Sequence, residues 1–353
     1  MRELKLLQVL ALAALIGSGC GSTGSGSAGP KPVNISFVYS LRTLNAMQEM
    51  VMGAKAAAQA SPGVTFAAKS PEETGVNGPA EVKVFQSATK TAKDGVALVT
   101  PVPDAFITPL QQARSSGIPI VAVDTPPPPG SDVGTFVGNS NFEVGQLLAT
   151  EMVKEIPVGA TGEVVIGNSI PGFPVLDQRI VGMLQVLKQQ RPTVKIVGPF
   201  NSHITEAENL AAWTAEVNQH PRALAYMAPA DLDALSLAKI QKLTGRHLLV
   251  GGCDLEDAGL QAIKDGYVYA LASPEHWLKG YISVKLLAEH AQAGEALPAG
   301  WWNPGALVVN KANIEDIIAR QHDEASRVQW FQAVVDKQFA HSSQYIKPLS
   351  AAT

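Results

Sequence analysis

Short polar side chains stand at the ends of three apolar runs, where they could contact a bound molecule. Asp124 ends IPIVAVD, Asn139 ends TFVGN and Asp254 ends LLVGGCD. In open parallel sheets, ligands bind at the carboxyl ends of the strands, so these residues are candidates for a binding site. The alternative for each is a helix N-cap, which would only satisfy free backbone amides. That alternative is weaker for Asp124, because the tract TPPPP follows it in place of a helix.

The chain lacks the motifs of common catalytic and metal sites. The segment GNSIPG (167–172) misses the G-x-S-x-G spacing of a hydrolase, and no Gly-Lys-Ser/Thr phosphate loop occurs. The seven His show no H-E-x-x-H spacing, and His203 with Glu206 is the nearest pair. Two Cys cannot form a four-cysteine zinc site. We therefore expect no metal, no cofactor and no enzymatic activity.

The composition of the 353 residues is that of a folded, mildly acidic protein. Apolar residues make up 46% and charged residues 16%, and 27 Lys+Arg against 31 Asp+Glu leave a net charge of −4. This composition excludes a disordered chain, a small disulfide scaffold and a basic nucleic-acid binder. The length predicts about two domains.

Short runs rich in Val and Ile alternate with helix-patterned segments from residue 33 onward. Most runs are apolar at both odd and even positions, which is typical of parallel strands covered by helices on both faces. Segments such as 45–60 and 141–156 repeat apolar residues at spacings of three and four and are predicted to be crossover helices. The predicted strands are 34–40, 64–70, 95–101, 118–125, 135–140, 163–169, 194–200, 223–229, 247–254, 268–274 and 305–311.

The number of strands favours two sheets over one. Open sheets usually have about four to six strands, so eleven strands fit two sheets of five or six better than a single sheet. A TIM barrel is the competing α/β solution, but it has eight strands and the chain shows no eightfold regularity. The predicted fold class is α/β with two parallel sheets.

The first residues indicate an export signal. Arg2 and Lys5 precede the uncharged run LLQVLALAALI (6–16). As a helix this run is too short to cross a hydrocarbon core of about 30 Å, but it matches the apolar region of a signal peptide. We therefore expect residues 1–19 to be an export signal.

Cys20 follows the small residues 17–19, an arrangement that resembles the bacterial lipobox, in which the cysteine thiol is acylated. Gly17 departs from that pattern, and the alternative is plain secretion with cleavage near Cys20. The resemblance implies a lipoprotein-type signal with Cys20 as the lipid anchor. Residues 20–32 contain mostly Gly and Ser and are expected to form a flexible tether.

Three segments in order along the chain carry a family resemblance. The predicted elements of residues 95–125 are a strand, a helix, a segment GIPI that is similar to a G-I-P-V motif, and a strand that ends in an aspartate. Those of residues 247–270 are a strand similar to V-V-G-F-D, a helix, a DG turn and a further strand. YMAPADLDALSLAKI (226–240) is the third. Together they resemble the periplasmic sugar-binding proteins of ABC transporters, which include ribose-binding proteins and the receptor for a furanosyl quorum-sensing signal. The resemblance covers most of residues 33–312.

This resemblance implies two Rossmann-like lobes with parallel sheets, joined by a three-stranded hinge, and a ligand bound in the cleft between them. The chain would cross between the lobes near Asn139, near Ser273 and Pro274, and near Asn303 and Pro304. The implied domains are an N-terminal lobe of residues 34–139 and 274–303, and a C-terminal lobe of residues 140–273 and 304–353 that includes a C-terminal helical extension.

The resemblance also assigns candidate ligand contacts. Asp124 matches the aspartate that accepts hydrogen bonds from sugar hydroxyls, and Asp254 matches the second-lobe aspartate. Arg179 matches an arginine that donates to sugar oxygens. Asn139 matches a polar hinge position, and Ala230 stands where the family has an asparagine.

The implied cleft departs from that of ribose binders in its loss of aromatic rings. Cys253 replaces the aromatic residue before the second aspartate, and the first loop offers Arg42 and Asn45 where ribose binders have paired Phe. Glu275 and His276, near the second crossing, could face the cleft. Because aromatic planes usually cover sugar faces, these departures argue against a plain pyranose or ribose site.

The implied function is that of an extracytoplasmic solute-binding lipoprotein, anchored to the cell membrane through Cys20. Its partners would be a sugar or polyol and the permease subunits of an ABC transporter, with no nucleic acid, and the protein would be a monomer. Two alternatives stay open: a receptor that presents ligand to a membrane sensor for chemotaxis or quorum sensing, and an exported α/β enzyme. A sugar-responsive repressor would need a helix-turn-helix where the export segment stands.

Overall fold

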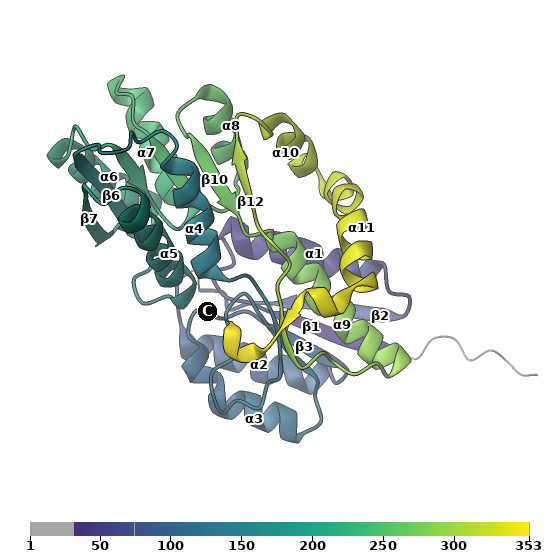
Figure 1. The fold of residues 1–353 in the computed structure, drawn as a ribbon. Coiled ribbons are helices and arrows are strands. Elements are labelled where there is room, and N and C mark those ends of the chain that lie inside the picture. The colour runs from purple at the N-terminus through teal and green to yellow at the C-terminus, as the bar shows by residue number, and fades with distance from the viewer. Residues whose placement is uncertain (1–31, 74, 353) are drawn as a thin grey trace, which may run out of the picture.

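The computed structural model of the protein describes residues 32–73 and 75–352. The predicted export signal (1–19), the predicted anchor Cys20 and the predicted tether up to residue 31 lie outside the described residues. The described chain forms two α/β lobes, one above the other in Figure 1. The predicted fold class, α/β with two lobes of mainly parallel sheet, is confirmed.

Each lobe is built on one sheet. The strand order is β13-β11-β5-β4-β3-β1-β2 in the first lobe and β12-β10-β9-β8-β6-β7 in the second. In both, the first five strands in chain order follow the doubly wound arrangement 2-1-3-4-5. The antiparallel pairs are β10 with β12 and β11 with β13. The strands are β1 (Val33–Val38), β2 (Val64–Lys69), β3 (Gly95–Leu98), β4 (Ile120–Val123), β5 (Thr135–Val137), β6 (Gly162–Asn168), β7 (Val194–Asn201), β8 (Ala225–Met227), β9 (Val250–Cys253), β10 (Ala270–Ser273), β11 (Gly300–Trp302), β12 (Leu307–Asn310) and β13 (Ile346–Lys347).

Helices cover both faces of each sheet. In the first lobe α1 and α9 pack on one face and α2 and α3 on the other, and in the second lobe α4 and α5 oppose α6, α7 and α8. Because both faces are covered, the central strands are apolar at nearly every position. The helices are α1 (Asn45–Gln59), α2 (Gly78–Thr91), α3 (Ile107–Ser115), α4 (Asn141–Met152), α5 (Pro174–Gln190), α6 (Glu206–Gln219), α7 (Asp231–Thr244), α8 (Asp257–Asp265), α9 (His276–Ala293), α10 (Ile314–Gln321) and α11 (Glu324–Ala340), with 3-10 turns η1 (Pro103–Phe106), η2 (Ser342–Gln344) and η3 (Leu349–Ala351).

Each lobe contains one pair of helices that approach closely at glycines. A Cβ atom added to Gly53 of α1 would lie 1.9 Å from the carbonyl oxygen of Trp277 in α9, and one added to Gly280 of α9 would lie 1.8 Å from that of Met50. In the second lobe, a Cβ atom on Gly145 of α4 would lie equally close to the backbone of α5. Only glycine permits such an approach. In the first lobe the approach sets the position of the first turns of α9.

The chain passes between the lobes after β5, after β10 and after β11. These crossings lie at residues 138–140, 274–275 and 303–306. In the first crossing Asn139 donates a hydrogen bond from Nδ2 to the carbonyl oxygen of Gly305 in the third, over 2.6 Å. The hydrogen bond therefore ties two of the crossing segments together.

The last part of the chain is divided between the two lobes, whereas the sequence predicted that residues 304–353 all belong to the second lobe. Helix α10 does pack there, with Ile314 and Ile317 in the core. Helix α11 returns to the first lobe, where Phe331 and Val335 enter the core, and β13 joins the sheet of that lobe. Figure 1 shows α11 beside α9. The apolar spacing of these helices predicts a buried face but does not indicate which lobe it covers.

Two short strands were not predicted. Strand β11 has three residues and β13 has two. Runs of this length are too short to show the alternation or the apolar character by which a strand is identified. Their addition to the first sheet makes it one strand wider than the second.

Candidate functional site

Asp124 and Asp254 occupy equivalent positions in the two lobes. Asp124 follows β4 and Asp254 follows β9, each the fourth strand of its lobe in chain order. Both residues have left-handed backbone, with φ of 63° and 66°, and the N–H of each donates over 2.9 Å to the strand that follows, at Val137 and Ala272. This conformation costs free energy in residues other than glycine and is concentrated at functional sites.

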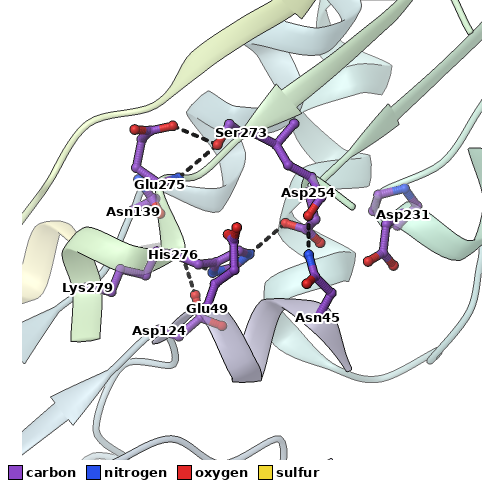
Figure 2. Close-up of polar contacts among 12 residues, drawn as sticks. Asn45, Glu49, Asp124, Asn139, Asp231, Asp254, Ser273, Glu275, His276 and Lys279 are labelled. Carbon is purple, nitrogen blue, oxygen red and sulfur yellow. Dashed lines mark hydrogen bonds and ion pairs between the residues drawn. The ribbon is translucent and has the colours of Figure 1, made fainter. Parts of the chain in front are cut away.

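A series of ion pairs and hydrogen bonds joins these two aspartates across the interface of the lobes (Figure 2). Lys279 Nζ lies 2.5 Å from Oδ1 of Asp124 and 3.3 Å from Nδ1 of His276. His276 Nε2 lies 2.8 Å from Oδ1 of Asp254, whose Oδ2 is 2.9 Å from Arg179. All five side chains are buried. Since α9 belongs to the first lobe and both Asp254 and Arg179 to the second, the network links the lobes.

The network favours the ionised forms of both carboxyl groups. Burial alone would raise the pKa of Asp124, but the charges of Lys279 and Arg179, with the hydrogen bond from Lys279, outweigh burial and lower it. Burial alone would also raise the pKa of Asp254. The charge of Arg179 is the largest of the effects that outweigh burial, and the pKa of Asp254 falls well below its usual range. Burial, together with the charge of Lys279, lowers the pKa of His276, so the imidazole is neutral at pH 7.

Arg179 is held rigidly on the second lobe. Besides pairing with Asp254, its Nη1 donates over 2.7 Å to the carbonyl oxygen of Pro229, and its Nε donates over 3.1 Å to Oδ1 of Asn141. Burial alone would lower the pKa of Arg179, but the Asp254 carboxylate outweighs burial and raises it. The guanidinium is therefore a fixed cation beside the second aspartate.

A small cavity of about 50 Å³ lies against this network. Ligand pockets commonly enclose roughly 300–1,000 Å³, so the lobes here are in a closed arrangement that leaves no room for a sugar. The polar part of its wall consists of Asp124, Ser169, Arg179, Asp231, Asp254 and His276, and the apolar part consists of Leu44, Ala46, Met47, Ile170, Phe173, Val175, Leu176, Ile204, Ala230 and Leu232.

An open groove of about 600 Å³ continues from the cavity over the second lobe, along α7 and α8. Leu44, Ile204, Asp231 and Leu232 line both the cavity and the groove. Burial, with the nearby charges of Asp254 and others, raises the pKa of Asp231 to about 7. Asp231 can therefore be either neutral or ionised at neutral pH, at the junction of the two spaces.

Most of the residues assigned from the sequence gather at these two spaces. Asn45 lines the groove and donates from Nδ2 to the carbonyl oxygen of Leu255 on the opposite lobe, so it contributes to the closed arrangement. The assigned residues in the cavity wall are Asp124, Arg179, Ala230 and Asp254.

Three assigned residues lie away from the cavity wall. Arg42 is exposed on the first loop. Asn139 is buried at the hinge, where it bonds Gly305. Glu275 is also buried, but its carboxylate is directed toward Ser273 and away from Asp254 (Figure 2), because Ser273 donates to it over 2.7 Å and a cation from α10 pairs with it.

Three residues of the site are not predicted by the sequence patterns: Lys279, Ser169 and Asp231. Lys279 follows His276 by three positions, which places both side chains on one face of α9, and this spacing was the available signal. Ser169 directly follows β6, at the same edge of the sheet as Asp254. Asp231 follows the assigned Ala230 and begins α7.

Neither a metal site nor a membrane-spanning helix is found in residues 32–73 and 75–352. No group of His, Cys, Asp and Glu in this part of the chain is arranged to bind a metal ion, and no helix in it is long and apolar enough to span a bilayer. Cys253 is buried, and burial raises the pKa of its thiol to about 12, so it is not an activated nucleophile.

Comparison with known sequences supports the family resemblance. The family model described as periplasmic binding protein domain matches residues 35–296. The xylose/arabinose-binding protein XylF of Sulfolobus acidocaldarius is 24% identical over 220 residues, which are 57% of this chain and 52% of that protein. The ribose import binding protein RbsB of Bacillus subtilis is 24% identical over 189 residues, 53% of this chain and 60% of that protein. The match therefore spans little more than half the length of these relatives.

Solved structures show the same fold. A solute-binding protein of an ABC transporter from Burkholderia graminis, in complex with D-arabinose, aligns with a TM-score of 0.73 at 23% identity, over 81% of this chain and 97% of that one. A periplasmic solute-binding protein from Actinobacillus succinogenes with bound D-allose aligns with a TM-score of 0.73 at 21% identity, over 80% and 99% of the two chains. At these identities the likeness shows the two-lobed fold.

Proposed function

Since this chain belongs to the periplasmic binding protein domain family, we propose that it binds a sugar or polyol between its lobes and delivers it to the permease of an ABC transporter. The observation that carries the proposal is the matched pair Asp124 and Asp254, one from each lobe, joined across the cleft by buried donors. Relatives named for xylose, arabinose and ribose support a sugar as the ligand.

The polar groups of the cavity suit a ligand with several hydroxyls. Each hydroxyl both donates and accepts, while the carboxylates of Asp124 and Asp254 only accept and the guanidinium of Arg179 only donates. Hydrogen bonds to ionised groups are roughly twice as strong as neutral ones, which offsets the cost of removing hydroxyls from water. The aliphatic wall and the ring of Phe173 would contact the C–H faces of the ligand.

Binding requires the lobes to separate, because the closed cavity is too small for a sugar. Separation breaks the contact of His276 with Asp254 and that of Asn45 with the Leu255 carbonyl. A ligand whose hydroxyls satisfy these groups from both lobes at once binds best when the lobes close around it. The ligand thus shifts the population toward a closed state, which the permease would recognise.

The proposal places the protein outside the cytoplasm, attached to the cell membrane through lipidated Cys20. A flexible tether up to residue 32 would let the lobes reach a permease in the same membrane. Replacement of Cys20 by Ala should release the protein from the membrane fraction of expressing cells, and retention in that fraction would contradict the anchor.

A titration of purified protein with sugars tests the proposal. D-arabinose, D-xylose, D-ribose, D-allose, pentitols and a furanosyl signal would be screened for a rise in melting temperature, and the strongest would be followed by calorimetry. We expect binding by wild type, strong loss in Asp124→Asn, and no change in the control Asp104→Asn, an exposed aspartate of the same lobe. No response to any of these compounds would contradict the proposal. Recovery of an altered sugar would instead favour the enzyme alternative.

A further inference from the structure

Three consecutive residues at the start of α9 are each held by a different part of the molecule. Glu275, which precedes the helix, pairs with Arg320 of α10. His276 contacts Asp254 of the second lobe across the cleft. Trp277 stacks on Phe331 of α11, with ring centroids 4.9 Å apart and the planes 9° from parallel. The second hinge crossing is therefore fixed both from the cleft side and from the C-terminal extension.

The pair of Arg320 and Glu275 is buried, and the backbone of Glu275 is left-handed. Nη1 of Arg320 lies 3.1 Å and 3.0 Å from the two carboxylate oxygens of Glu275, and Ser273 donates to the same carboxylate over 2.7 Å. Arg320 is 3% exposed and Glu275 7%. Glu275 has a φ of 52°, a left-handed conformation that residues other than glycine adopt only when their surroundings impose it.

The C-terminal extension, residues 313–351, connects the lobes a further time. Its first helix, α10, packs in the core of the second lobe and its second, α11, in the core of the first (Figure 1). Between them the end of α10 reaches the first lobe, where Gln321 donates to the buried Glu49 of α1. Arg327 of α11 lies 4.0 Å from the same carboxylate. Separation of the lobes must therefore move or break these contacts.

We propose that Arg320 is a positioning residue for the ligand cleft and that the extension favours the closed arrangement of the lobes. Arg320 holds Glu275 in its left-handed conformation, which sets the direction of the first turn of α9 and places His276 against Asp254. The ligand in this proposal is the sugar or polyol of the proposed function, but the effect on the lobes requires no ligand.

The test compares wild type with a double variant, Arg320→Met with Glu275→Gln, which removes both buried charges at once and so leaves none unpaired. Thermal unfolding first establishes that the variant folds. Small-angle scattering then measures the radius of gyration without ligand, which we expect to be larger than that of wild type. Sugar affinity should not fall, because the closed arrangement without ligand leaves no room for a sugar and competes with binding.

Two further variants complete the experiment. Arg320→Lys keeps the positive charge and should give a radius of gyration between those of wild type and the double variant. A variant that only disturbed packing would not recover part of the wild-type radius through the charge. Lys55→Met removes the exposed ion pair of Lys55 with Glu324, 3.2 Å long and within the first lobe, and should leave the radius unchanged. A folded double variant with the radius of wild type would overturn the proposal. If wild type binds no sugar, the proposed function fails, but the comparison of radii still decides this inference.

Discussion

Lys279 lies one helical turn after His276, and its Nζ approaches Nδ1 of the imidazole to 3.3 Å. An ammonium group only donates hydrogen bonds, so Nδ1 is the unprotonated nitrogen and Nε2 carries the proton of the neutral ring. Nε2 then donates to Oδ1 of Asp254 over 2.8 Å. One neutral imidazole thus connects the cation beside Asp124 with the carboxylate of the opposite lobe.

Lys279→Met should destabilise the protein by about 3–5 kcal/mol, because it leaves the buried Asp124 carboxylate without its cation. The double variant Lys279→Met with Asp124→Asn should lose less, since no unpaired charge remains. Denaturant unfolding of wild type, both single variants and the double variant gives the coupling energy. Equal losses in the Lys279 variant and the double variant would show that the ion pair is not the cause.

Asp254→Asn should weaken sugar binding by about 2–5 kcal/mol, which corresponds to tens to thousands of times in the dissociation constant. The amide cannot accept charge-assisted hydrogen bonds, and it leaves Arg179 without its counter-ion. Calorimetry with the best sugar measures the change. The matched control is Asp265→Asn, an exposed position at the end of α8 in the same lobe. An affinity unchanged in Asp254→Asn would remove this residue from the site.

The buried carboxyl of Glu49 should make stability depend on pH. Burial raises its pKa to about 7, although Gln321, Arg320 and Arg327 oppose the shift. Between the ordinary pKa of 4.5 and about pH 7, the folded state holds a proton that the unfolded state has released, so this group makes stability fall as pH rises across that window.

Glu49→Gln imitates the protonated acid and removes this dependence. Wild type should therefore lose stability relative to Glu49→Gln as the pH rises from 5 to 7.5. Above pH 7.5 the difference in their unfolding free energies should stay constant. Denaturant unfolding at five pH values measures it. A difference that does not change with pH would mean that Glu49 is ionised throughout.

Gly53→Ala should destabilise the first lobe by about 1–3 kcal/mol or more, because the new Cβ would meet the carbonyl oxygen of Trp277 and force α1 and α9 apart. Gly134→Ala is the control, since a Cβ there meets no atom within 4 Å. Thermal and denaturant unfolding measure both. A Gly53 variant as stable as the control would show that the two helices can move apart without loss.

Local patterns were sufficient for most of the fold. A strand buried on both faces must be apolar at nearly every position, and a crossover helix must repeat apolar residues at spacings of three and four, so strands and helices are visible without a structure. The sequence also identifies Asp124 and Asp254 as candidate site residues, because each stands where a predicted strand ends. Strands β11 and β13 were missed because two or three residues carry no such pattern.

What the sequence alone determined, then, is the order of strands and helices, the α/β class and the two aspartates at strand ends, since each depends on neighbours in the chain. The tertiary structure alone decided which cations meet those aspartates and which lobe α11 covers. Lys279 meets Asp124 across 155 positions, and Arg320 meets Glu275 across 45. Pairings at such separations depend on how the helices pack, and an apolar face or a lone charge does not specify which partner it will meet.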